Sequence, residues 1–234
     1  MLPKLIILHG LNNNSTTWDE FEGVMNERGF KTVRITLPRH GDIRDEGKNF
    51  EEELKVFDEK LRPHIQEPYV VVAYSLGALF FENWLIGRKE SLPLKQVLLA
   101  PCLLLRREKW VRQIIGSLLP FIPIPSIAPR DIMLYKTMFV WEYRNLLGGL
   151  SRFQKSSEKI SVPSLVIIDP KDELIDGQKL KEEWKKKNSG EFYFLKRPSQ
   201  KWGPSYHHIL FHSKYFTANE WSNYIGKIEN FLKA

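Results

Sequence analysis

A serine flanked by small residues lies in the pentapeptide AYSLG at residues 73–77. An apolar run at 69–72 precedes it and a helical stretch at 78–87 follows, so the pentapeptide is predicted to form a sharp turn between a strand and a helix. Such a turn projects the hydroxyl of Ser75 beyond the sheet edge as a candidate nucleophile. It also leaves the amide of Leu76 at the helix start, where it can donate to a developing oxyanion. The alternative is an ordinary turn with a surface serine.

A serine hydroxyl is a poor nucleophile unless a base takes its proton and a third group positions that base. Residues 164–176 offer four carboxylates in or just after a predicted strand: Asp169, Asp172, Glu173 and Asp176. We expect Asp172 to be the acid, because it lies beyond the strand end where a loop can bend back. Asp169 is the rival, and the other two are typical of helix-entry or surface groups.

Two adjacent histidines, His207 and His208, follow the last predicted strand about 35 residues after the acid, which gives the chain order serine, acid, histidine. Adjacent side chains point in different directions, so only one of them can serve as the base. Their pairing does not indicate a metal site, because no cysteine or third ligand lies at a suitable spacing. No metal and no cofactor are expected.

The second oxyanion donor is expected in the loop after the first strand. His9 and Gly10 permit close approach of the backbone there, and Leu11 presents an amide. A simple strand-to-helix connection would look the same in the sequence.

Apolar runs alternate with helical patterns along most of the chain. The runs lie at 4–9, 32–37, 69–73, 95–100, 164–169 and 191–196, and the helical patterns at 18–29, 50–65, 76–88, 176–187 and 217–232. The alternation predicts an α/β fold, with a mostly parallel sheet of about six strands and helices on both faces. Loops at the carboxyl ends of parallel strands share one edge, so the candidate residues are expected to meet there.

Residues 102–160 do not follow the alternation. They contain helical patterns at 107–119 and 132–147, joined by the proline-containing stretch FIPIP at 121–125, which cannot stay helical. We expect 1–101 and 161–234 to form the core domain and 102–160 to form an inserted helical cap. The alternative is two extra core helices.

Length and composition suit one large, ordered domain, with 234 residues of which 42% are hydrophobic. The single cysteine, Cys102, excludes an internal disulfide and is expected to be a buried thiol. The start of the chain does not resemble a signal peptide, and no apolar run approaches the ~20 residues of a membrane span. A cytoplasmic protein without a transmembrane segment is expected.

Most of the net charge of +7 lies in the predicted cap, which contains ten lysines and arginines but only four acids. This basic segment could attract an anionic substrate or a lipid surface, or it could be a solvated face. In the lipid case, exposed Ile122, Ile124 and Ile127 would form the docking face. No motif for reading nucleic acid accompanies the charge.

Taken together, these positions resemble the α/β-hydrolase family, specifically its small bacterial carboxylesterase, monoglyceride-lipase and lysophospholipase-like members. The motifs span nearly the whole chain: His9-Gly10, LPRHG at 37–41 where the family often has L-P-G-H-G, the Ser75 turn, Asp172 in its loop, and SYH at 205–207. Two departures are Arg39 and Asp169, each standing where the family commonly has glycine.

The resemblance implies an α/β-hydrolase fold in which Ser75 is the nucleophile, Asp172 the acid and His207 the base, with the amides of Leu11 and Leu76 as oxyanion hole. His207 is preferred to His208 because YHHILF at 206–211 looks like the family's Arg-His-Glu-Ile-Leu-Phe ending.

The activity expected from this set is hydrolysis of a carboxylic ester through an acyl-enzyme. Thioester, lactone or carbon–carbon bond hydrolysis on the same triad is the alternative, as is a non-catalytic binding protein that keeps the fold. The expected substrate is a small ester, anionic or lipid-like, with its acyl group shielded by residues 118–127. His9, Arg39 and Tyr74 are candidate substrate-binding residues, with Arg39 placed near any negative charge.

Overall fold

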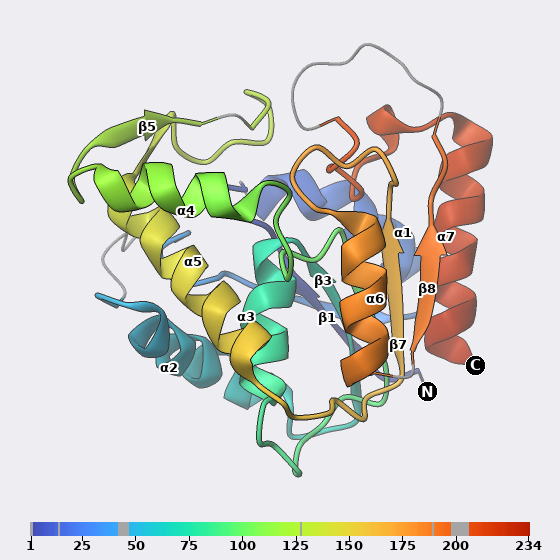
Figure 1. Cartoon of the computed structure of the whole chain (residues 1–234). Helices are drawn as coiled ribbons and strands as arrows, with labels where there is room; N and C mark the ends of the chain where they lie inside the picture. The colour runs from blue at the N-terminus through green and yellow to red at the C-terminus, as the bar shows by residue number, and fades with distance from the viewer. Residues whose placement is uncertain (1, 14, 42–46, 127, 189, 198–205) are drawn as a thin grey trace.

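The centre of the molecule is a six-stranded parallel sheet with the strand order β2-β1-β3-β4-β7-β8 (Figure 1). The structure is a computed structural model that describes residues 2–13, 15–41, 47–126, 128–188, 190–197 and 206–234. The strands are β1 (Lys4–Leu8), β2 (Lys31–Ile35), β3 (Tyr69–Tyr74), β4 (Gln96–Leu99), β7 (Ser164–Ile168) and β8 (Glu191–Phe194). The predicted parallel sheet is confirmed, and each expected strand forms within two residues of its predicted ends.

Helices cover both faces of the sheet, as predicted. On one face, α1 (Asp19–Glu27) and α7 (Ala218–Lys233) pack against alternate strand residues such as Leu5 and Ile7. On the other, α2 (Phe50–Leu61), α3 (Leu76–Leu85), α5 (Val140–Lys155) and α6 (Gly177–Lys187) pack against the intervening residues. This alternation follows from the two-residue period of a strand, which sends successive side chains to opposite faces.

The central strand β3 reads YVVVAY and is buried along its whole length. A run of β-branched residues suits a strand that has helices on both sides and no solvent-facing edge. Because β3 is paired with β1 and β4, its carboxyl end is fixed in the middle of the sheet. The turn that begins at Ser75 therefore starts from a rigid position.

The segment between β4 and β7 differs from its predicted form. The helix α4 (Glu108–Ser117) lies within the first helical pattern, but the stretch with the prolines forms a strand, β5 (Pro123–Pro125), which pairs antiparallel with β6 (Thr137–Phe139). The second helix therefore begins at Val140 and not at 132. Prolines fit a two-stranded ribbon because proline has no backbone N–H to donate, and the outer edge of each strand has no neighbouring strand that needs one.

Helix α5 packs against α2 and α3, so the second half of the inserted segment is joined to the core. The helix α4 and the strand β5 lie together at one end of the molecule in Figure 1. Among the described residues, no helix has both the length and the apolar composition to cross a membrane.

Candidate active site

Ser75 occupies the sharp turn between β3 and α3, with φ 48° and ψ −109°. A non-glycine residue in this region carries strain on the order of 1–3 kcal/mol, which is typical of functional turns. A Cβ atom on Gly77 would lie 2.6 Å from the carbonyl oxygen of His9, so only glycine lets α3 start this close to β1. Ala73 remains inside β3 and does not have a positive φ, which explains why alanine fits there.

A continuous chain of hydrogen bonds links Ser75, His208 and Asp172. The Oγ atom of Ser75 lies 2.9 Å from Nε2 of His208, and Nδ1 of His208 lies 2.8 Å from Oδ2 of Asp172. The other carboxylate oxygen of Asp172 accepts the amides of Leu174 and Ile175, each at 2.8 Å. All three members are buried, so the hydroxyl, the imidazole and the carboxylate interact with little competition from water.

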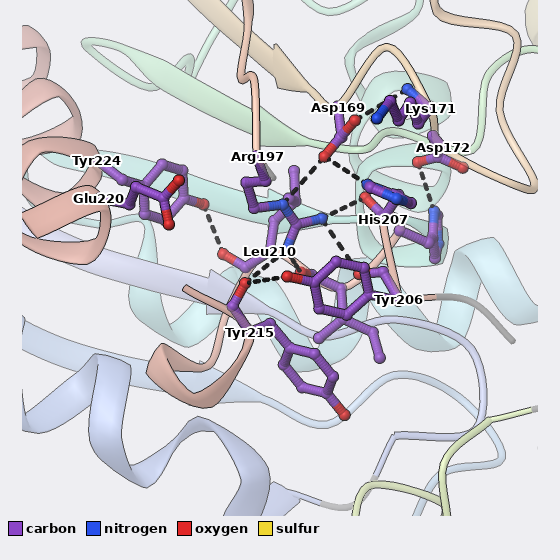
Figure 2. Close-up of polar contacts among 12 residues, drawn as sticks. Asp169, Lys171, Asp172, Arg197, Tyr206, His207, Leu210, Tyr215, Glu220 and Tyr224 are labelled. Carbon is purple, nitrogen blue, oxygen red and sulfur yellow. Dashed lines mark hydrogen bonds and ion pairs between the residues drawn. The ribbon is translucent and has the colours of Figure 1, made fainter. Parts of the chain in front are cut away.

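His207 does not face Ser75, and the prediction that it does is wrong. Its Nδ1 lies 2.8 Å from Oδ2 of Asp169, whereas the imidazole beside Ser75 Oγ is that of His208. The two adjacent imidazoles point in different directions, and each has its own carboxylate. His208, the alternative in the sequence prediction, occupies the position beside the serine. Asp169, the rival acid, is engaged with His207 and with Arg197 at 3.0 Å (Figure 2).

The loop after β1 lies beside Ser75 and is held by two buried histidines. His9 accepts the amide of Leu37 at 3.0 Å, and His40 accepts the amide of Asn12 at 2.8 Å. Burial lowers the pKa of His9 to about 4 and that of His40 to about 3, so both are neutral and able to accept at neutral pH. Leu11 lies between these fixed positions and lines the cavity beside Ser75.

Asn12 ties this loop to the inserted segment. Its side chain donates to Ser126 Oγ and to the carbonyl oxygen of Tyr135, each at 2.8 Å, and accepts the amide of Tyr135 at 2.7 Å. Asn12 has a φ of 56°, a conformation that asparagine tolerates better than most residues. Asn12 thus connects the proposed oxyanion loop to Ser126 and Tyr135 of the inserted segment.

Arg39 is not among the residues that line the cavity, which removes the support for its placement near a substrate charge. Its guanidinium forms a buried ion pair with Glu53 and lies 4.4 Å over the ring of Trp141. The imidazole of His9 is likewise engaged with the backbone, and His9 is not a lining residue. Of the three candidate substrate-binding residues, Tyr74 alone lines the cavity.

A cavity of about 860 Å³ opens onto Ser75 and His208. Most of its lining is apolar and comes from the inserted segment, including Trp110 and Ile114 of α4 and Leu146 of α5. Cys102 also lines it, and burial raises the pKa of its thiol to about 12, so it stays protonated and unreactive. Among the described residues, no cluster of three or more histidines, cysteines or acids could hold a metal ion.

Three residues that contribute to the site were not identified from the sequence: Asn12, Glu173 and Arg197. Asn12 lies in the loop after the first strand, where asparagine is typical of any turn, and Glu173 follows the expected acid, where a glutamate is typical of a helix entry or the surface. Arg197 follows the last strand, where a basic residue carries no signal of its own. The sequence signal that could have indicated Arg197 is Asp169, which replaces the family's glycine, because a buried carboxylate needs a positively charged or hydrogen-bonding partner. Ser205 of the SYH motif lies outside the described residues.

Comparison with known proteins adds to this geometry. Among solved structures, the monoacylglycerol lipase of Paleococcus ferrophilus superposes with a TM-score of 0.73 at 16% identity, covering 99% of this chain and 95% of that one. A soluble variant of monoglyceride lipase from Saccharomyces cerevisiae, in complex with a substrate analog, gives 0.73 at 8% identity, with 99% and 87% covered. An esterase from Exiguobacterium antarcticum gives 0.65 at 11% identity, with 99% and 92% covered. No curated protein matches the chain.

These likenesses show a shared fold. The model of the alpha/beta hydrolase family matches residues 5–212, which is most of the chain and includes the Ser75 turn, Asp172 and His208. The chain therefore belongs to the alpha/beta hydrolase family.

Proposed function

We propose that the protein is a serine hydrolase that cleaves carboxylic esters, with Ser75 as nucleophile, His208 as base and Asp172 as acid. The observation that carries the proposal is the unbroken hydrogen-bond chain from Ser75 Oγ through His208 to Asp172. Its distances match those of a nucleophile, a base and an orienting acid. The lipases and esterases with the same fold support the same class of reaction.

In the proposed mechanism, Ser75 Oγ attacks the ester carbonyl while Nε2 of His208 accepts its proton. Asp172 accepts a hydrogen bond from Nδ1 of His208, which fixes the tautomer and stabilises the imidazolium. The amides of Leu11 and Leu76 donate to the tetrahedral oxyanion. His208 then protonates the leaving alcohol, and a water activated by the same imidazole hydrolyses the acyl-enzyme.

The cavity favours an ester with an apolar acyl chain. Its volume of about 860 Å³ exceeds the needs of an acetyl group, and its walls beside Ser75 are mainly Leu, Ile, Val and aromatic side chains. The charged groups at its edge, Arg106, Arg107 and Glu173, do not give it a single sign of charge. We therefore expect turnover of p-nitrophenyl esters to rise from acetate to medium-length acyl chains.

Substitution of the two histidines tests the assignment most sharply. Ser75→Ala and His208→Ala are each expected to lower kcat on p-nitrophenyl butyrate by at least about 10³-fold, because they remove the nucleophile or its base. His207→Ala is the matched control and is expected to retain far more activity than His208→Ala. A fluorophosphonate probe is expected to label wild type and not Ser75→Ala. Equal losses in the two histidine variants would contradict the assignment of His208.

We further propose that the inserted segment contacts a lipid surface. Four large apolar side chains on α4 and in the loop after it are exposed, and we call them the apolar patch: Trp110 (67%), Ile114 (55%), Leu119 (72%) and Phe121 (80%). Trp110 and Ile114 also line the cavity, so the apolar patch is continuous with the cavity wall on α4. Exposed aromatic and aliphatic groups beside basic residues such as Lys109 suit the interface of an anionic membrane.

The residues of the apolar patch differ from those predicted. Ile122 and Ile124, which the lipid case expects to be exposed, are half-buried and pack against the core, whereas Ile127 lies outside the described residues.

Co-sedimentation with phosphatidylglycerol vesicles tests the contact. The double variant Trp110→Ser/Phe121→Ser is expected to weaken binding by about tenfold or more, because it removes two large apolar groups from the interface. Leu94→Ser is the control, since Leu94 is 53% exposed but does not line the cavity. Equal binding by the double variant and wild type would refute the contact.

A further inference from the structure

In the described part of the loop that carries His208, no helix or strand holds the backbone. Residues 206–211 are turn and irregular backbone, although catalysis would require the imidazole to be fixed within a fraction of an ångström. Side chains from other parts of the chain take up the hydrogen bonds of this loop instead (Figure 2).

The guanidinium of Arg197 lies at the centre of these contacts. Its Nη2 donates to the carbonyl oxygens of Tyr206 at 3.1 Å and His207 at 2.7 Å, and its Nη1 donates to those of Ile209 at 3.0 Å and Tyr215 at 3.3 Å. Its Nε donates to Asp169, so each of the five N–H groups of the arginine has an acceptor. Three of these acceptors belong to the residues immediately around His208.

Burial makes this arrangement rigid. The Arg197 side chain has no exposed surface, and its guanidinium lies 4.9 Å from the rings of both Tyr206 and Phe216. Asp169 is the buried counter-charge, and it also accepts a hydrogen bond from His207 Nδ1. The loop is therefore attached to Asp169 twice, through Arg197 and through His207.

Glu173 holds the same loop from the opposite side of the peptide groups. Its two carboxylate oxygens accept the amides of His207 and His208, each at 3.1 Å. Glu173 lies directly after Asp172, so the segment that supplies the acid also grips the backbone of the base. Arg197 thus binds backbone carbonyls of this loop and Glu173 binds its backbone amides. The imidazole of His208 makes its own hydrogen bonds, with Ser75 and Asp172.

We propose that Arg197 is a positioning residue for the reaction, with Asp169 as its counter-charge and Glu173 as its complement. This inference rests on the proposed function, because it assigns the cause of the His208 geometry on which that function depends. Arg197 does not itself line the cavity, and its hydrogen bonds in the loop go to the backbone carbonyls of Tyr206, His207 and Ile209. It therefore acts on His208 through the backbone of residues 206–209.

Arg197→Lys is the central test. Lysine keeps the charge opposite Asp169, but a single ammonium group cannot serve four carbonyls in different directions. We expect kcat per titrated active site to fall about 10- to 100-fold while KM changes less than about twofold, because a displaced base affects the chemical step and not the acyl cavity. Arg62→Lys, at an exposed arginine in an i,i+4 ion pair, is the control and is expected to leave both constants unchanged.

Glu173→Gln is a second variant, chosen because Glu173 is exposed and its replacement is expected to fold. Glutamine has one acceptor oxygen, so it can keep at most one of the two amide contacts, and a smaller fall in kcat per site, about 3- to 10-fold, is expected. Active sites are counted by fluorophosphonate titration in every case. A variant that loses active sites but keeps wild-type kcat per site would show that Arg197 serves folding alone and would overturn the proposal.

Proton NMR gives a readout that does not require turnover. The Nδ1 proton of His208, shared with Asp172, is assigned by its absence in His208→Ala, and we expect it to shift or broaden in Arg197→Lys but not in Arg62→Lys. An unchanged resonance together with unchanged kcat per site refutes the positioning role. A wild type that hydrolyses no ester and is not labelled at Ser75 refutes the proposed function, and the resonance alone then decides the role of Arg197.

Discussion

At the scale of single residues, neighbouring side chains of one type have separate tasks. His207 and His208 are adjacent, and Asp169 and Asp172 are three residues apart, yet the structure divides them into two pairs. One pair reaches Ser75 and the other meets Arg197. The chain order alone predicted that an acid and a histidine would meet there. It did not predict which histidine, because that depends on the path of an irregular loop fixed by Arg197 and Glu173.

Glu82 is a buried acid with no part in the site. It lies in α3, and burial raises the pKa of its carboxyl to about 8. In the unfolded chain the group ionises near 4.5, so the folded state keeps a proton that the unfolded state loses between these values. The contribution of Glu82 to stability is therefore present below pH 4.5 and is lost as the pH rises towards 8.

Glu82→Gln is expected to remove this pH dependence. The variant is expected to gain stability relative to wild type as the pH rises from 5 to 8, by on the order of 2 kcal/mol, because the amide carries no charge to bury. Urea denaturation at both pH values measures the difference. Glu90→Gln, at an exposed acid, is the control, and a gain for Glu82→Gln that is equal at pH 5 and pH 8 would contradict the assignment.

At the scale of elements, the turn at Ser75 depends on the contact between α3 and β1. Added at Gly77, a Cβ atom would meet His9 O at 2.6 Å and Leu8 Cβ at 2.8 Å, both in the rigid strand region. Gly23 of α1 offers the opposite case, since nothing lies within 4 Å of the corresponding position.

Gly77→Ala and Gly23→Ala are therefore expected to change stability in opposite directions. The first forces α3 away from β1 and is expected to cost about 1–3 kcal/mol, whereas the second removes a glycine from a helix interior and is expected to gain about 0.5–1 kcal/mol. The free energies of unfolding in urea provide the comparison. A neutral Gly77→Ala would mean that the start of α3 can move without strain.

The elements most accurately predicted from the sequence are those with a clear period. The strands and helices of the core were found because alternating apolar runs and helical patterns have few other interpretations. The ribbon of β5 and β6 was missed because three-residue strands have no period to detect, and the helix beginning at 140 was extended too early through an apolar stretch that forms β6. The prolines correctly excluded a helix at 121–125, but they did not reveal the pairing partner.

At the scale of the whole molecule, the sheet and the inserted segment have different surfaces. The sheet is enclosed by helices on both faces, whereas α4 presents Trp110 and Ile114 to solvent beside the cavity. The sequence does not predict this exposure, because an amphipathic helix has the same residue pattern whether its apolar side is buried or exposed to solvent. The position of the apolar patch therefore had to come from the structure.

The side chain of Asn12 joins Ser126 and Tyr135 of the inserted segment to the loop whose Leu11 amide is proposed to donate to the oxyanion. Moving Ser126 and Tyr135 away from Asn12 would break these hydrogen bonds next to Leu11, so opening the cavity at this point is expected to disturb the proposed oxyanion donor. Substitutions that widen the cavity here are expected to lower kcat unless they preserve the hydrogen bonds of Asn12.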